Sequence, residues 1–303
     1  MTGRLFPALL AMTACCWSPA LHAQFTDPRN YTVAPVGLNQ LELDVGHAEA
    51  DASLDTTLEV VGAHFEQNAG SVSYTHNFAM LGQLAWVQAS VPFASVSGSV
   101  AGTDIAGSTT GLGDSSLQLA ALLKGGTALS AAEFEKYEPS TTLGLSLTVS
   151  APTGEYNADK LLNLGSNRWS FKPEFAVSKP FGAEGSWVLD LYANVYFFTD
   201  DTAYHGTEIL REEALPGVEG HISHDFTRSL WVSLDLRYSF RGGTIVDNVS
   251  QNDPQENLTA GTEVSWSPSS NHSLTFLFAK ALIYRNAPAE TVVALKYVYS
   301  WGG

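Results

Sequence analysis

Residues 141–152 read TTLGLSLTVSAP, a stretch in which apolar and small polar side chains alternate. Successive side chains of an extended strand point to opposite faces, so this segment has one apolar and one polar face. The apolar face carries Leu143, Leu145, Leu147 and Val149, and the polar face carries Gly144, Ser146, Thr148 and Ser150. This alternation is typical of a strand in a soluble β-sandwich or in a membrane barrel, where lipid covers the apolar face.

Similar segments recur along the chain, and turn-forming Gly, Asn, Asp, Ser and Pro residues separate them. The candidate strands are 38–48, 56–65, 71–78, 84–93, 113–123, 141–151, 169–179, 187–198, 213–226, 230–240, 257–267, 273–283 and 291–301. This number is odd, whereas single-chain bacterial outer-membrane barrels have an even number of strands. Either a strand is misassigned within 38–65, or one is missed near 95–106. We predict an all-β fold over residues 38–301, an antiparallel transmembrane outer-membrane β-barrel of about 12 strands, with 14 as the alternative.

The first 23 residues have the features of a secretory signal peptide. Arg4 provides the positive start, a short apolar run follows, and a cleavage site is predicted after Ala23. Residues 24–37 are then expected to form an N-terminal periplasmic segment. Lipoprotein processing at Cys15 or Cys16 is a rival interpretation, but the preceding residues fit a lipobox poorly. Both cysteines fall within the removed segment, so we expect no disulfide and no cysteine-based site.

Composition and charge restrict the functions that the chain could have. Of its 303 residues, 15 are Lys or Arg and 31 are Asp or Glu, which gives a formal net charge of −16. Phosphate binding requires clustered cations, so nucleic acid is not an expected partner. We interpret the acidic surface first as a solvated coat. It is also compatible with contact to lipopolysaccharide through divalent cations, or with the rejection of anions. After residue 23 no apolar run approaches the length of a spanning helix.

The polar strand faces carry charges of both signs in mid-strand, which a soluble sandwich would expose to water and a barrel would turn into its lumen. The residues predicted to line the lumen are Lys172, Glu174, Asp190, Tyr192, Asn194, Glu219, His221, Asp235, Arg237, Glu263 and Lys296. Tryptophans favour the barrel, because aromatic girdles lie where strands meet the lipid headgroups. Those near candidate strand ends are Trp86, Trp169, Trp187, Trp231, Trp266 and Trp301. Pro173 lies in mid-strand, where it predicts a bulge or kink.

The last strand alternates almost to the end of the chain, through Val293, Leu295, Tyr297, Tyr299 and Trp301. It is similar to the C-terminal strand by which the outer-membrane assembly machinery recognises its barrels, although Gly302 and Gly303 follow the final aromatic residue. We therefore expect the assembly machinery, outer-membrane lipid and lipopolysaccharide as partners.

Two stretches carry a family resemblance. One is GLGD at 111–114, and the other runs from APTGEY at 151–156 through NLGSNRW at 163–169 to FKPE at 171–174. Together they resemble the outer-membrane barrels associated with the meta pathway of phenol degradation. The motif positions are Gly111, Gly113, Asp114, Pro152, Gly154, Asn163, Gly165 and Asn167. The resemblance implies an outer-membrane location and the passage of hydrophobic or aromatic small molecules. The residues themselves favour turns at strand ends over ligand binding, with glycine adopting backbone angles that other residues avoid.

No hydrolase elbow, metal-protease motif, phosphate loop or complete dinucleotide fingerprint is present. His221 and Ser223 share a strand face, but an enzyme is the weakest hypothesis, and we expect no metal and no cofactor. The predicted function is an outer-membrane channel for small, hydrophobic or aromatic solutes that diffuse passively through the lumen. The alternative is a non-transporting barrel with a structural or surface-interaction role.

Overall fold

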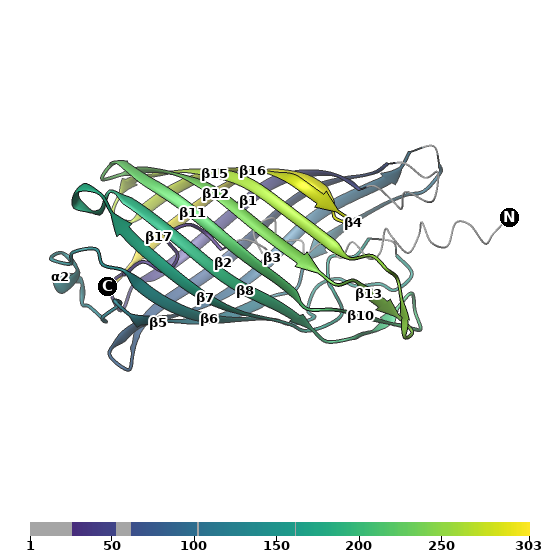
Figure 1. Cartoon of the computed structure of the whole chain (residues 1–303), viewed down its shortest axis with the longest axis horizontal. Helices are drawn as coiled ribbons and strands as arrows, with labels where there is room; N and C mark the ends of the chain where they lie inside the picture. Colours follow the sequence, from purple (N-terminus) through teal and green to yellow (C-terminus); the bar gives the residue numbers. More distant parts are fainter. Residues whose placement is uncertain (1–25, 53–61, 102, 161) are drawn as a thin grey trace.

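The computed structural model describes residues 26–52, 62–101, 103–160 and 162–303. Its strands form a closed antiparallel barrel (Figure 1), because β2 pairs with β3 as well as with β1. The strands of the main sheet are β1 (Asn39–Ala52), β2 (Ala63–Met80), β3 (Gln83–Val100), β4 (Ala106–Leu112), β5 (Ser116–Lys124), β6 (Thr142–Ser150), β7 (Ser170–Phe181), β8 (Trp187–Phe198), β11 (Leu215–Thr227), β12 (Leu230–Arg241), β15 (Gln255–Ser269), β16 (His272–Arg285) and β17 (Ala289–Trp301).

The barrel has twelve strands, as the sequence predicted, because β4 and β5 are two parts of one strand. Both pair with β3, β5 along residues 85–90 and β4 along residues 93–99, with a break at residues 113–115. The extra candidate strand arose because β2 is a single strand of 18 residues where 56–65 and 71–78 were predicted. Residues 53–61 lie outside the described part of the chain. No strand was missed near 95–106, where β3 ends and β4 begins.

The two ends of the barrel differ in their connections (Figure 1). At one end, with the C-terminus, most connections are short, such as residues 228–229 and 270–271, which is typical of the periplasmic side. The exception there is the loop at 125–141, with a short helix, α2 (Ala131–Phe134). Hydrogen bonds from the Ser130 side chain and backbone hold the pKa of the Glu133 carboxyl in this helix below its usual value.

At the opposite, outer end the connections are mostly longer, and a second antiparallel sheet extends above β8, β11 and β12. Its short strands are β9 (Asp201–Tyr204), β10 (Glu208–Glu212), β13 (Thr244–Val246) and β14 (Val249–Ser250). Back at the end with the C-terminus, a 3₁₀ turn, η1 (Ala183–Gly185), connects β7 to β8 and lies against Pro139 of the loop at 125–141. In the described part of the chain, no helix has the length and apolar character needed to span a membrane.

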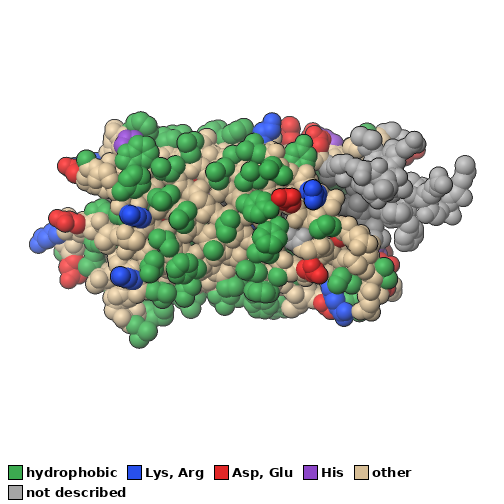
Figure 2. Space-filling view, viewed as in Figure 1, with side chains coloured by type: hydrophobic (Ala, Val, Ile, Leu, Met, Phe, Trp, Pro, Cys, Tyr) green, Lys and Arg blue, Asp and Glu red, His purple; other side chains and the backbone are tan. Residues whose placement is uncertain are grey.

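The outer wall of the barrel is apolar along its middle (Figure 2), and charged side chains gather toward the two ends of this face. On β12, Leu234 and Leu236 are exposed while Ser233, Asp235 and Arg237 between and beside them are buried. This is the reverse of a soluble protein, and acyl chains would cover the exposed leucines. The chain therefore has the fold of an outer-membrane β-barrel.

The prediction that six tryptophans form an aromatic girdle on the outer wall is correct for four of them. Trp169, Trp187, Trp266 and Trp301 are exposed on the outer wall, as expected of an aromatic girdle. Trp86 is buried inside the barrel and donates a hydrogen bond to Gln118 (Nε1 to Oε1, 3.2 Å). Trp231 also faces inward, where the Arg29 guanidinium carbon lies 5.0 Å from its ring centroid. These two side chains pack against polar and aromatic groups of the lumen instead of lipid.

The bulge or kink expected at Pro173 is absent. β6 pairs with β7 in continuous register through Pro173, which lies opposite Leu147. On the other side, the ladder to β8 is interrupted near Pro173 but resumes in the same register at Glu174. Proline has no N–H to donate, so one hydrogen bond to β8 is absent at this position. The two strands accommodate its absence without a shift in register.

We predict that Leu234→Arg destabilises the barrel by about 2–4 kcal/mol, because it places a cation against acyl chains in the middle of a spanning strand. The measurement is reversible urea unfolding in lipid vesicles. Leu234→Ala is the control and should cost less, because it only removes apolar surface. Equal and small effects of the two substitutions would contradict the assignment of this face to lipid.

Candidate functional site: the barrel lumen

The structure places every residue predicted to line the lumen inside the barrel wall, and all of them are buried. They are Lys172 and Glu174 on β7, Asp190, Tyr192 and Asn194 on β8, Glu219 and His221 on β11, Asp235 and Arg237 on β12, Glu263 on β15, and Lys296 on β17. They alternate with side chains that are exposed on the outer wall, such as Leu191 and Leu236. Reading the strand period from sequence was sufficient to assign these directions.

A network of hydrogen bonds and ion pairs joins the carboxylates on β7 and β11. The Asn194 side-chain amide donates to Glu174 (Oε2, 3.1 Å) and to Glu219 (Oε1, 3.0 Å). Lys172 pairs with Glu174 at 3.1 Å, and Arg237 lies 3.8 Å from Glu219. Burying these charges is costly unless they are paired, so the network stabilises an otherwise unfavourable polar interior.

The His221 and Ser223 pair does not form a catalytic arrangement. The His221 ring contacts the Asp235 carboxylate (Nδ1 to Oδ1, 2.8 Å), and Ser233 donates to the other oxygen of the same carboxylate. Ser223 accepts a hydrogen bond from Arg29 instead (Nε to Oγ, 2.8 Å). A hydrolase would require a hydrogen bond between the histidine and the serine, which these partners replace.

The segment at 24–37 was expected in the periplasm, but its described residues enter the lumen and contact the wall. The Thr26 backbone N–H donates to Glu219 (2.9 Å), and its hydroxyl donates to Glu174 (2.7 Å). The Arg29 guanidinium pairs with Asp225 (2.6 Å), and the Asp27 carboxylate pairs with Lys296. The physical reason is the excess of acceptors on the wall, which the donors of this segment satisfy.

Tyr31 anchors the same segment and is fully buried. Its hydroxyl lies 2.9 Å from Glu174 and 2.8 Å from Ser146. Its ring packs against Trp86 and Tyr192, with centroids 5.4 and 5.3 Å away. Below this aromatic group, an apolar cluster joins the segment to the loop at 125–141 at the periplasmic end. Its further members include Val33, Leu84, Leu122, Leu129, Phe134 and Tyr137.

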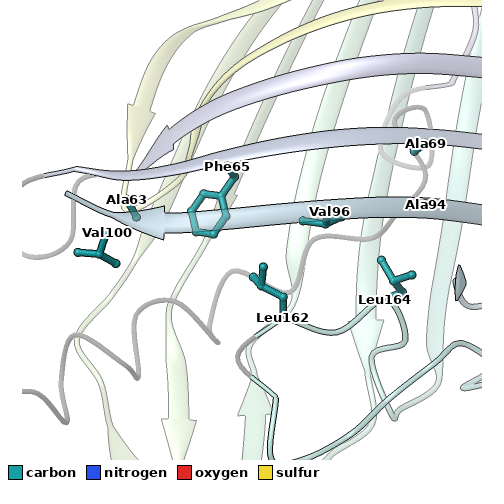
Figure 3. Packing of buried hydrophobic residues seen from close by; sticks show 8 residues of the cluster. All are labelled: Ala63, Phe65, Ala69, Ala94, Val96, Val100, Leu162 and Leu164. Atoms are coloured by element: carbon teal, nitrogen blue, oxygen red, sulfur yellow. The ribbon is translucent and has the colours of Figure 1, made fainter. Parts of the chain in front are cut away.

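The interior changes character toward the outer end, which the sequence analysis did not predict (Figure 3). There, apolar side chains of β2 and β3 point inward and meet two leucines of the loop at 151–169. We call this cluster the vestibule. It consists of Ala63, Phe65, Ala69, Ala94, Val96, Val100, Leu162 and Leu164. Phe65 lies across Gly98, where a Cβ would approach the ring to 2.7 Å, so glycine is required for this packing.

The outer surface of the wall changes at the same level. Val72 and Tyr74 of β2 are exposed below Gly70, but the outward residues above it are His64, Glu66 and Asn68. His64 pairs with Asp51 of the neighbouring strand at 2.9 Å. Charged side chains on the outside and apolar ones inside are the arrangement of a barrel in water, so the wall continues beyond the membrane. Reading residues 63–80 as one strand would have revealed this change of pattern.

The family-motif residues hold the loop at 151–169 onto the wall. Asp114, at the break between β4 and β5, accepts hydrogen bonds from the backbone N–H groups of Gly154 and Ser166, each at 2.8 Å, and from the Ser166 hydroxyl at 2.5 Å. Asn163 closes the loop on itself, because it bonds Asn157 through both its oxygen and its nitrogen. Pro152 is exposed at the exit from β6.

Gly154 and Gly165 of the motif are required by close packing, whereas the sequence analysis expected unusual backbone angles. Neither Gly111 nor Gly113 has a positive φ. A Cβ at Gly111 would lie 2.1 Å from the Glu155 carboxylate. Gly154 and Gly165 touch each other, so a Cβ on Gly154 would lie 2.7 Å from the Gly165 Cα. The loop therefore crosses the strand break at a distance that only glycine permits.

The far side of the loop is bound to the second sheet. Asn167 donates to Asp201 (Nδ2 to Oδ1, 2.6 Å), and the Tyr156 hydroxyl donates to the other oxygen of Asp201 (2.9 Å). Arg168 pairs with Glu212 at 2.9 Å, and both side chains are almost completely buried. Asn167 has a positive φ of 53°, which asparagine tolerates better than most residues. The loop thus bridges β4 and the second sheet and places Leu162 and Leu164 in the vestibule.

The acidic residues of the outer loops act as hydrogen-bond acceptors for neighbouring backbone. Asp253 accepts from the N–H and hydroxyl of Thr244, and Asp247 accepts from the N–H of Ile209. Within the described residues, no group of three or more potential ligands is arranged to hold a metal ion.

We predict that Asp114→Ala releases the loop at 151–169, at a cost of about 1–3 kcal/mol, because buried N–H donors lose their acceptor. The check is the rate of tryptic cleavage after the exposed Lys160, which should rise. Asp104→Ala, which removes an exposed carboxylate from the neighbouring outer connection, is the matched control. If both variants resist trypsin like the wild type, Asp114 does not hold the loop.

We also predict that Tyr31→Ala raises the single-channel conductance in planar bilayers, because it removes the buried ring that fills the lumen between Trp86 and Tyr192. Thr32→Ala serves as the control, since the Thr32 side chain bonds only the Arg29 carbonyl of its own segment among the described contacts. Unchanged conductance of the Tyr31→Ala barrel, with its fold intact, would show that this segment does not limit flow.

Comparison with solved structures supports the fold. The COG4313 outer membrane channel from Pseudomonas putida F1 matches with a TM-score of 0.80 at 23% identity, over 91% of this chain and 100% of that one. The transport unit of the autotransporter AIDA-I from Escherichia coli gives 0.56 at 9% identity, over 98% and 99% of the two chains. The β domain of the Bordetella autotransporter BrkA gives 0.54 at 10%, over 88% and 100%. These likenesses show the fold of the chain.

A sequence search of curated proteins gave no match. A family model does match, along residues 49–297, and its description reads "Putative MetA-pathway of phenol degradation". This range includes all of the motif residues and nearly the whole barrel wall. The chain therefore belongs to this phenol-degradation family of outer-membrane β-barrels.

Proposed function

We propose that this protein is an outer-membrane channel that passes small hydrophobic or aromatic solutes by passive diffusion. The observation that carries the proposal is the vestibule, an apolar interior at the level where the outer wall has become polar. Apolar side chains turned away from lipid and toward the lumen are not needed to hold a barrel in the membrane. They provide a surface on which an apolar solute arriving from outside would lose its hydration shell.

The position of the vestibule supports capture followed by slow passage. Its floor is the level of Gly70 on β2, below which the outward Val72 and Tyr74 are apolar again. Below that level the lumen is polar, and the segment containing Thr26 and Tyr31 contacts its wall. A solute would therefore bind among apolar groups first and then pass the polar contacts. Phenol has this mixed character, and the family description names phenol degradation.

The alternative is a barrel that transports nothing and has a structural or surface role. The buried contacts of Thr26, Arg29 and Tyr31 favour it, because they would close the lumen if they never open. Planar-bilayer conductance and uptake of labelled aromatics separate the two functions. A barrel that neither conducts nor admits aromatics would support the alternative.

Lipid, lipopolysaccharide and the assembly machinery are the partners that this proposal includes. The outward Val293, Leu295 and Trp301 of β17 are exposed, as an assembly factor that binds the last strand would require. Contact with lipopolysaccharide would involve the outward acidic residues above the membrane, such as Glu49 and Glu66.

We predict that Phe65→Ala and, separately, Leu162→Ser reduce aromatic uptake several-fold while small-ion conductance stays unchanged. Both substitutions remove apolar surface from the vestibule without touching the polar contacts of Thr26 and Arg29. The measurement is the initial rate of uptake of labelled toluene into proteoliposomes with lipopolysaccharide in the outer leaflet, less the rate of protein-free vesicles. His64→Ala, next to Phe65 but outward-facing, should have no effect. Uptake that is insensitive to both vestibule variants would contradict the proposal.

A further inference from the structure

We propose that the lumen selects neutral aromatic solutes and rejects anionic ones, through an excess of carboxylates immediately below the vestibule. This inference rests on the proposed function, because it names the class of solute that the same pathway accepts. We call these carboxylates the acidic belt. They are Glu42, Asp44, Glu174, Asp190, Glu219, Asp235 and Glu263.

The cations that face the belt are fewer than its carboxylates and already have acidic partners. Within the described part of the wall at this level, the inward lysines and arginines are Lys172, Arg237 and Lys296. Lys172 pairs with Glu174, Arg237 lies near Glu219, and Lys296 pairs with Asp27 and lies opposite Asp44 on the neighbouring strand. Each of these cations therefore already lies against a carboxylate, which weakens its attraction for an additional anion.

The segment that occupies the lumen does not correct the imbalance. It adds one cation, Arg29, and one anion, Asp27, and both are engaged in ion pairs with the wall. Arg29 also donates its backbone N–H to the Asp190 carboxylate at 2.9 Å. The belt thus remains net negative if the segment stays in place, and it stays net negative if the segment moves out.

The vestibule above the belt increases the discrimination. Every member of the cluster is apolar, so an anion that enters it gives up water without gaining a cation there. At the next level down the anion meets carboxylates in an interior of low dielectric, where like charges repel far more strongly than in water. Rings of acidic side chains make pores selective for cations by the same interaction. A neutral aromatic of the same shape has no charge to desolvate in the vestibule and is not repelled by the carboxylates.

Two belt carboxylates are suited to a test because no described hydrogen bond joins them to residues 26–36. They are Asp44 on β1, which bonds Ser71, and Asp235 on β12, which bonds His221 and Ser233. Glu174, Glu219 and Asp190 are less suitable, since each bonds Thr26, Tyr31 or Arg29 and their loss would also disturb the segment. The variant is Asp44→Asn with Asp235→Asn, which removes charge but keeps side-chain size. The matched control is Glu49→Gln with Glu66→Gln, on outward positions of β1 and β2.

The experiment compares benzenesulfonamide, which is neutral at pH 7, with benzenesulfonate, which has nearly the same shape and a full negative charge. Initial uptake rates are measured in proteoliposomes containing the full mature barrel, less the rates of protein-free vesicles. We expect wild-type barrels to admit the sulfonate at least about tenfold more slowly than the sulfonamide. In the belt variant the ratio should fall severalfold, and in the outward control it should not change.

A second readout is the reversal potential in a potassium chloride gradient across a planar bilayer, on the same preparations. The reversal potential of the wild type should show a preference for potassium over chloride, and the reversal potential of the belt variant should lie closer to zero. Equal uptake of the two solutes by wild-type barrels would overturn the inference and leave the proposed function intact. Uptake of neither solute would overturn the proposed function. In that case the reversal potential still tests the inference, and a value of zero, or one that shows a preference for chloride, would overturn it.

Discussion

The structure depends on the closure of one hydrogen-bonded sheet. Inside a membrane there is no water to pair with free backbone N–H and C=O groups, so a spanning sheet must leave no edge. Pairing of β2 with β3 along their whole length joins the ends of the strand order and removes the edge. With the backbone hydrogen bonds satisfied in this way, the alternation of side chains decides which residues face lipid and which face the lumen. Leu234 and its outward neighbours contact lipid, and Asp235 and its inward neighbours must find partners in the lumen.

The polarity of the inward and outward faces changes along the barrel axis, from the membrane-spanning part to the outer end. In the membrane, the inward face is polar, and the donors of Thr26, Arg29 and Tyr31 fill part of it. Above Gly70, the outward face meets water and carries His64 and Glu66, which leaves the inward face free to be apolar. The loop fixed by Asp114 then adds Leu162 and Leu164 to that apolar interior. The candidate solute pathway is a consequence of where the wall leaves the lipid.

Much of this arrangement could be predicted from the sequence because it depends only on a period of two. The barrel class and the inward direction predicted for residues such as Lys172 and Arg237 followed from the alternation along each strand. The strand number followed from the even count that bacterial barrels require, because the candidate strands themselves numbered thirteen. The position of residues 26–36 did not, since the donors of Thr26 and Arg29 have no periodic pattern and their partners lie more than 100 residues away. The directions of Trp86 and Trp231 were wrong for a related reason. Both residues were assigned to the aromatic girdle because they lie near strand ends, and the face of the strand on which each lies was not considered.

The motif glycines show a different limit. Gly154 and Gly165 are needed because two chain segments cross in contact, and such a crossing is a tertiary feature that backbone rules for turns do not contain. The break after Leu112 was likewise missed, because the predicted strand 113–123 begins within it and leaves out β4, although β4 and β5 act as one strand in the sheet. The sequence identified the correct positions here but the wrong physical reason.

The central claim is that apolar solutes enter the barrel through the vestibule. The most direct test is a crystal structure of the barrel soaked with bromobenzene, in which anomalous scattering locates the bromine without reference to a fitted model. The account predicts a bromine peak inside the barrel, between Phe65, Val96 and Leu162. Bromine found only against the outward leucines of the wall, with nothing inside the barrel, would contradict it.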